Sequence, residues 1–226
     1  MSNIVFAAVI AIVLPTHLSA QEKATLDPVR VSLAGLHLSQ LAFGALGVLV
    51  ITSEYGSGMI RASLAAVPRR RLLLAAKTLV FASTALIIAT LSSFASYFIY
   101  QAFLSDHSLR TSLNDPGVLR AVTGGGLFLT VLGLLGLGLG AILRSSAGAI
   151  AALFGLLFVP TILAGVLPQS WQNTIDPYLP MNAGDAIYLV HRDASSLGAW
   201  SGFGVFCLYA ATALSVGFLL ITRRDA

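Results

Sequence analysis

The chain has 226 residues, of which 57% are hydrophobic and only 10% are charged, and its mean hydropathy is +0.88. Soluble domains carry about 25% charged residues, so this composition excludes an ordinary soluble globular protein and favours an integral membrane protein. The net charge of +4 does not indicate nucleic-acid binding, because the basic residues lie at the ends of apolar runs, where they set membrane topology. The single cysteine, Cys207, excludes an intrachain disulfide.

Apolar runs of membrane length predict an all-α integral membrane protein with six transmembrane helices in a single domain, residues 1–226. The predicted spans cover residues 3–19, 33–52, 72–100, 118–143, 147–167 and 197–222. The first run is short for a span and contains Pro15, so a signal peptide is the alternative interpretation. Because no Lys or Arg precedes this run, whereas a signal peptide begins with a basic region, we favour a membrane helix.

The segment from Ser53 to Lys77 connects the second and third predicted spans and orients the chain. It holds five of the 13 Lys and Arg residues against one acid, Glu54. Because Lys and Arg concentrate in cytoplasmic loops, this segment is predicted to be cytoplasmic. Eight basic residues then lie on the cytoplasmic side and five on the outer side, and six spans place both termini in the cytoplasm.

The same segment predicts an amphipathic helix from Glu54 to Val67 on the membrane surface. At 100° per residue, one face of this helix is apolar and carries Ile60, Leu64 and Val67. A neighbouring face is polar and carries Glu54, Ser57 and Arg61. Pro68 ends the helix, because its ring is incompatible with a helix interior.

Glycines recur along the fourth predicted span, at Gly126, Gly133, Gly136 and Gly140. Small residues let helices approach closely in a membrane, where lipid offers no hydrophobic drive for helix association. A nucleotide-binding loop is the competing interpretation, but the chain contains no Gly-x4-Gly-Lys-Ser/Thr pattern. The glycines therefore predict a helix-packing seam, within or between protomers.

The longest polar interruption, from Pro168 to Leu197, is predicted to face outward. It contains Trp171, Tyr178 and several prolines, which suit short interfacial helices before the sixth span. At the outer end of the second span, His37 is interpreted as a histidine that reaches toward the interface, with a ligand contact as the alternative.

We identify no catalytic, cofactor-binding or metal-binding residues. Asp106 and His107 lack further ligands at metal-site spacing. An intramembrane serine protease, suggested by Ser201-Gly202, lacks a histidine in the central part of any span to act as base. The chain is therefore not predicted to be an enzyme.

Two groups of residues, far apart in the chain, carry a family resemblance. The first is Glu54-Tyr55, Gly58, Ile60-Arg61, Leu64, Pro68-Arg69-Arg70 and Lys77, and the second is Trp171, Ile175, Pro177-Tyr178-Leu179-Pro180, Asn182-Ala183-Gly184 and Ala186-Ile187. Together they resemble the ABC-2 type permeases of ATP-binding-cassette exporters, especially the actinobacterial type. Met59 departs from the pattern, since a threonine commonly occupies that position, and the family's basic N-terminal stretch is not in this sequence.

The resemblance implies a multi-pass permease in the plasma membrane that works as a homodimer with two copies of a cytoplasmic ATPase. ATP and magnesium would then bind the ATPase, this chain would bind no cofactor, and a hydrophobic or amphipathic compound would be exported. The residues that match the family's coupling segment are Glu54, Gly58, Ile60, Arg61, Leu64 and Pro68. The alternative is an ion-coupled secondary transporter, which usually needs ionisable groups or broken helices near the bilayer midplane.

Overall fold

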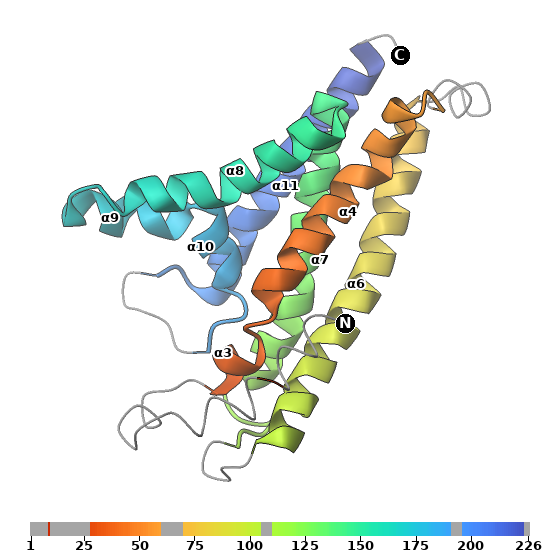
Figure 1. Cartoon of the computed structure of the whole chain (residues 1–226). Coiled ribbons are helices and arrows are strands. Elements are labelled where there is room, and N and C mark those ends of the chain that lie inside the picture. Colours follow the sequence, from red (N-terminus) through yellow and green to blue (C-terminus); the bar gives the residue numbers. More distant parts are fainter. Residues whose placement is uncertain (1–8, 10–27, 60–69, 105–109, 191–195, 224–226) are drawn as a thin grey trace.

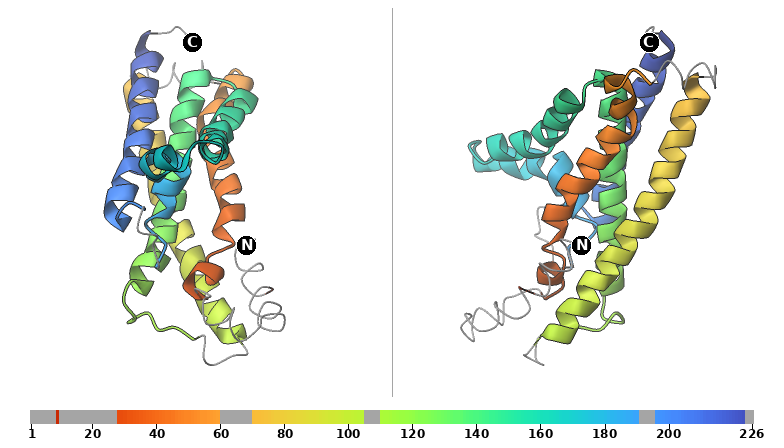
Figure 2. Two further views of the ribbon diagram at one scale, coloured as in Figure 1. Left: turned by 90° about the vertical axis from the view of Figure 1, so that its left-hand side faces the viewer. Right: turned by 45° about the vertical axis from the view of Figure 1, so that its right-hand side comes forward.

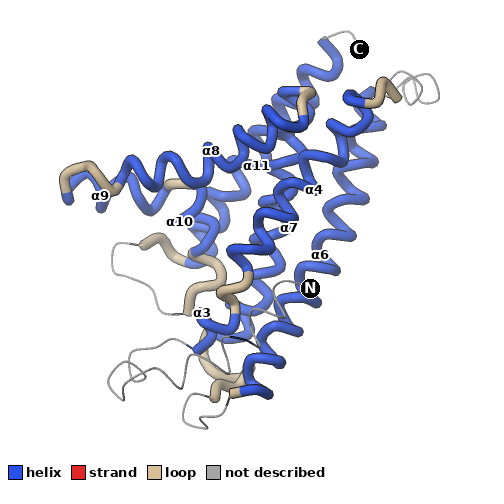
Figure 3. Tube along the Cα trace, in the orientation of Figure 1, coloured by secondary structure: helices blue, strands red, loops and turns tan. Residues whose placement is uncertain are grey.

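The computed structural model describes residue 9 and residues 28–59, 70–104, 110–190 and 196–223. All regular elements within these ranges are helices, as Figure 3 shows. Five of them are long and apolar enough to cross a membrane. The predicted first span, residues 3–19, lies outside the described residues apart from residue 9.

The five long helices correspond to the second to sixth predicted spans. They are α4 (Leu36–Gly56), α6 (Arg70–Phe103), α7 (Val118–Leu143), α8 (Ser146–Ala164) and α11 (Ala199–Arg223). Four short helical segments complete the described fold: α3 (Pro28–Ser32), α9 (Gln169–Ile175), η2 (Asp176–Tyr178) and α10 (Pro180–Asp185). Short helices were predicted before the last span. Of these, α10 buries Pro180, Ala183 and Gly184 inside the protein.

The amphipathic helix predicted from Glu54 to Val67 is wrong as a continuous element. The helix of the preceding span, α4, runs on through Glu54 to Gly56, and Ser57 caps it. Gly58 then has a φ of +72°, which a right-handed helix cannot continue through. The helix that contains Glu54 therefore ends before residue 60, and residues 60–69 lie outside the described part of the chain.

Helix α7 is the centre of the molecule. In the most apolar 18-residue stretch of α7, 67% of the residues are buried, whereas the corresponding stretches of α6 and α11 have 22% and 28% of their residues buried. Helices α4, α6 and α11 all pack along it, as Figure 1 shows. Its glycines remove side-chain bulk on several faces, and this allows three neighbours to approach one helix closely.

Helix α8 leaves this bundle at a steep angle (Figures 1 and 2). The turn that redirects the chain is built on Arg144, which adopts the left-handed conformation with φ 53°. The Arg144 N–H donates to the carbonyl of Gly140 and ends α7. Ser145 then starts α8, since its hydroxyl accepts from the N–H of Gly148 at 3.4 Å. The short helices α9 and α10 return the chain to the bundle.

Candidate functional site

One end of the bundle gathers the end of α4, the start of α6, the α7–α8 junction and the end of α11 (Figure 1). We call this the inner end, because the basic residues Arg71, Lys77, Arg144 and Arg223 belong to these helix ends. The opposite end carries Arg30, Arg110 and Arg120.

An ion pair joins α4 to α6 at the inner end. The Nζ atom of Lys77 lies 2.8 Å from Oε1 of Glu54, and the two side chains are only 19% and 20% exposed. Lys77 also donates to the carbonyl of Val50 at 3.1 Å. Val50 lies one turn before Glu54, so Lys77 contacts α4 at two points, a backbone carbonyl and a carboxylate.

Two further contacts tie the end of α4 to the α7–α8 junction. The guanidinium carbon of Arg144 lies 5.1 Å from the centre of the Tyr55 ring, a cation–π distance. The hydroxyl of Ser146 donates to that of Thr52 at 2.8 Å. We define the inner-end cluster as Thr52, Glu54, Tyr55, Lys77, Arg144 and Ser146. These contacts fix four helix ends to one another.

The residues predicted to couple to an ATPase fall partly within this region. Glu54 belongs to the cluster, and Gly58 lies in the turn after α4, where an added Cβ would have no neighbour within 4 Å. The other predicted coupling residues, Ile60, Arg61, Leu64 and Pro68, lie outside the described residues. Glu54 was expected to contact a partner protein, but its Oε1 binds Lys77 of the same chain. Its second carboxylate oxygen, Oε2, is buried and has no hydrogen-bond partner among the described residues.

The predicted glycine seam lies where α7 contacts α4 and α6. A Cβ atom at Gly136 would lie 2.6 Å from the carbonyl oxygen of Gly44, and one at Gly140 would lie 3.0 Å from that of Val48. Gly133 faces the ring of Phe81. A Cβ atom on Gly47 of α4 would overlap the backbone of Gly133. At Gly126 a Cβ would lie 2.7 Å from the Cα of Thr90 in α6. All four close approaches are within this one chain.

A second polar site lies away from the inner end, between α3 and the short helices α9, η2 and α10. The carboxylate of Asp185 accepts a hydrogen bond from the Tyr188 hydroxyl at 2.6 Å. Burial raises the pKa of Asp185 to about 7, although the Tyr188 hydrogen bond and the positive charge of Arg30 oppose this rise. Asp185 thus titrates near neutral pH, a property that is common at functional sites.

Arg120 of α7 fixes the backbone that follows Asp185. Its guanidinium donates to the carbonyls of Ile187 and Leu189 at 2.9 and 3.0 Å. Neither Arg120 nor Asp185 was predicted to be a site residue from the sequence. The available signal was Asp185 itself, a single acid in the otherwise uncharged stretch from Leu179 to Val190.

No group of three or more His, Cys, Asp or Glu side chains in the described residues could hold a metal ion. Asp106 and His107 lie outside those residues.

No protein-family model matches this chain, and no curated protein matches it significantly. The assignment of a function therefore depends on the sequence resemblance and on the geometry described above.

Proposed function

We propose that the chain is the permease subunit of an ABC-2 type ATP-driven exporter. The observation that carries the proposal is the placement of the first resemblance group. Glu54, Tyr55 and Lys77, which are distributed over two helices, all take part in the inner-end cluster. A segment that receives motion from another protein must be attached firmly to several helices, and the contacts of these residues meet that requirement.

The contacts of the inner-end cluster give it a mechanical role in this proposal. The Glu54–Lys77 ion pair joins the ends of α4 and α6, which flank residues 57–69. The Tyr55–Arg144 contact links the same point to α7 and α8. A displacement of the connecting segment would therefore move several helices together. We assign Gly58, Ile60, Arg61, Leu64 and Pro68 to the surface that meets the ATPase, and Glu54 to the joint behind it.

The charges within the long helices favour this proposal over an ion-coupled transporter. Glu54, Lys77 and Arg120 lie toward the ends of their helices, and α8 contains no Asp, Glu, Lys or Arg. Ion-coupled transporters usually place ionisable groups or broken helices near the bilayer midplane. The energy would then come from a separate ATPase that binds ATP and magnesium, with two copies of it serving a permease homodimer in the plasma membrane. The exported compound would be hydrophobic or amphipathic.

Co-purification and ATP hydrolysis test the proposal. We expect a neighbouring reading frame to encode the ATPase; the chain is expressed with that protein, and the complex is isolated in detergent and reconstituted in liposomes. We expect both proteins to elute together and Arg61→Lys to reduce ATP hydrolysis, because lysine cannot reproduce the planar fork of arginine. Arg110→Lys is the matched control, since Arg110 lies at the opposite end of the bundle.

The competing function gives a different result. An ion-coupled transporter would work in liposomes that contain this chain alone and would respond to an imposed pH or sodium gradient. Gradient-driven transport of a fluorescent amphiphile without the ATPase, together with failure of the two proteins to associate, would overturn the proposal.

A further inference from the structure

The space beside Asp185 is a polar cavity of about 330 Å³. This volume lies at the lower end of the range for small-molecule sites, about 300–1,000 Å³. Its walls combine amides, two carboxylates and one guanidinium: Gln169, Asn173, Asn182, Asp176, Asp185 and Arg30. A neighbouring cavity of about 260 Å³ shares Arg30 and Asp185. Polar groups from α3, η2, α9 and α10 therefore face one space.

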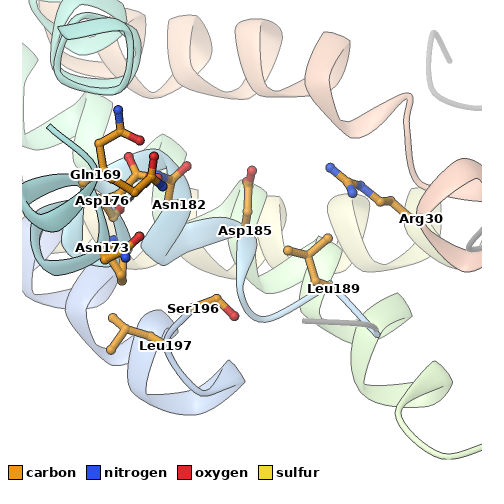
Figure 4. A pocket seen from close by; sticks show the side chains of 11 residues that line it. Arg30, Gln169, Asn173, Asp176, Asn182, Asp185, Leu189, Ser196 and Leu197 are labelled. Carbon is orange, nitrogen blue, oxygen red and sulfur yellow. Dashed lines mark hydrogen bonds between the residues drawn. The ribbon is translucent and has the colours of Figure 1, made fainter. Parts of the chain in front are cut away.

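Opposite charges lie at different places in this cavity. Figure 4 shows Asp185 between Arg30 on one side and Asp176 with Asn182 on the other. The side chains of Gln169, Asn173 and Asp176 make no hydrogen bond to another described residue. Asp185 is partly buried and accepts a hydrogen bond from Tyr188, while Arg120 anchors the adjoining backbone. The site thus offers fixed acceptors at one end and guanidinium donors at the other.

We propose that this cavity binds an ethanolamine phosphodiester, with its ammonium between Asp176 and Asp185 and its phosphate at Arg30. Figure 4 places Arg30 and Asp176 on opposite sides of Asp185, an order that matches a ligand with an ammonium at one end and an anion at the other. Arginine matches the geometry of phosphate, and a primary ammonium brings three N–H donors to the carboxylate and amide oxygens.

The lining also distinguishes among ammonium groups. A quaternary ammonium, such as choline, is recognised mainly by aromatic faces. The side chains that line the larger cavity include no aromatic ring among the described residues. We therefore assign the primary amine. This inference does not depend on the proposed exporter role, because it concerns binding to this chain alone.

The ligand has two sources, and the experiment separates them. The purified chain in detergent is titrated with glycerophosphoethanolamine, and the chain in nanodiscs is compared in phosphatidylethanolamine and in phosphatidylcholine. Glycerophosphocholine and glycerol phosphate are the soluble comparators. Binding of the soluble ethanolamine compound, measured by calorimetry, supports a free ligand. A thermal stabilisation found only with phosphatidylethanolamine supports a lipid head group. Equal responses to the ethanolamine and choline forms, or no response to either, overturn the proposal.

Variants locate the site. Asp185→Asn and Arg30→Gln should each weaken binding by about tenfold or more, the effect of losing one charge-assisted contact. Asp115→Asn and Arg110→Gln are the matched controls, because both residues are exposed and lie outside the cavity. Asn173→Trp fills the cavity from an exposed position of α9 and should abolish binding without disturbing the core. Unchanged affinity in Asp185→Asn, Arg30→Gln and Asn173→Trp places the ligand elsewhere and overturns the assignment.

The pH dependence of the affinity for the ethanolamine compound provides an independent measurement. An ammonium binds the charged carboxylate, so affinity should rise with pH as Asp185 loses its proton near pH 7 and should level off above it. The charged or titratable groups around Asp185 are Arg30, His37, Asp176 and Tyr188. Because His37 also titrates, His37→Gln is measured beside Asp185→Asn. The rise should persist in the first variant and vanish in the second. A rise that persists in Asp185→Asn contradicts the role of this carboxylate.

Discussion

Arg144 shows how a single residue can hold an unfavourable backbone conformation. Its φ of 53° costs a residue with a Cβ atom about 1 kcal/mol or more relative to glycine, the usual residue at such a helix end. Its guanidinium lies over the ring of Tyr55, so the arginine is retained by a contact that glycine could not make.

We expect Arg144→Gly to be more stable than Arg144→Ala by about 1 kcal/mol, since both lose the Tyr55 contact but only alanine keeps the strain. Thermal unfolding of the two variants in detergent measures the difference. Equal stabilities would show that position 144 does not adopt the left-handed conformation.

The Glu54–Lys77 ion pair is the second contact that can be tested at this scale. Lys77→Met leaves the partly buried carboxylate of Glu54 without its cation and should destabilise the fold by about 1–3 kcal/mol. Adding Glu54→Gln should recover part of this loss, because the unpaired charge is then removed. A double-mutant cycle on thermal stability measures the coupling between the two residues. Additive effects would show that the pair contributes nothing beyond its separate side chains.

Among the elements, α7 depends most on the absence of side chains. Its glycines allow the backbones of α4, α6 and α11 to approach it, and even a methyl group at several positions would meet a neighbouring backbone atom. Close packing of this kind replaces hydrophobic burial as the source of helix association in a membrane.

Gly136→Ala should therefore destabilise the protein by about 1–3 kcal/mol, because its Cβ would lie 2.6 Å from the Gly44 carbonyl oxygen. The matched control is Gly155→Ala in α8, where an added Cβ has no neighbour within 4 Å. That substitution should be neutral or stabilise the helix by up to about 1 kcal/mol. Thermal unfolding of both variants is the measurement, and a control that is destabilised as much as Gly136→Ala would contradict the packing explanation.

At the scale of the whole molecule, the long helices present apolar side chains outward. Leu79 and Leu91 of α6 are 70% and 65% exposed, and Ile162 of α8 is 71% exposed. Apolar side chains exposed to this degree along membrane-length helices favour a covering of lipid or protein. The polar groups collect instead at the inner end and in the cavity beside Asp185.

This arrangement predicts the orientation of the chain in the membrane. In a Cys207→Ala background, a cysteine at Thr174 should react with an impermeant thiol reagent on intact cells, and one at Ser57 should react only after lysis. Both positions are exposed, and they lie in α9 and in the turn after α4, respectively. The expectation follows from the excess of Lys and Arg at the inner end. Labelling of Ser57→Cys on intact cells, with Thr174→Cys protected, would show that the chain has the opposite orientation.

The helices themselves could be predicted from the sequence. The span predicted at residues 118–143 has the same bounds as α7, because Pro116-Gly117 precedes the apolar run and a polar Arg-Ser-Ser turn follows it. The span predicted at 33–52 differs from α4, which runs from Leu36 to Gly56, because Lys77 pairs with Glu54 and allows the helix to continue past that carboxylate. Hydropathy shows where the apolar run ends, but a paired carboxylate can remain helical beyond that point.

The partners of the polar residues were decided only by the tertiary structure. Glu54 with Lys77 and Tyr55 with Arg144 are brought together from different helices, and Arg30 and Asp185 come to line one cavity. Membrane helices are apolar on nearly every face, so hydrophobic periodicity does not indicate which faces meet. Transfer into lipid is a local property of each segment and can be estimated from its own residues, whereas close packing around α7 depends on the shapes of four helices at once.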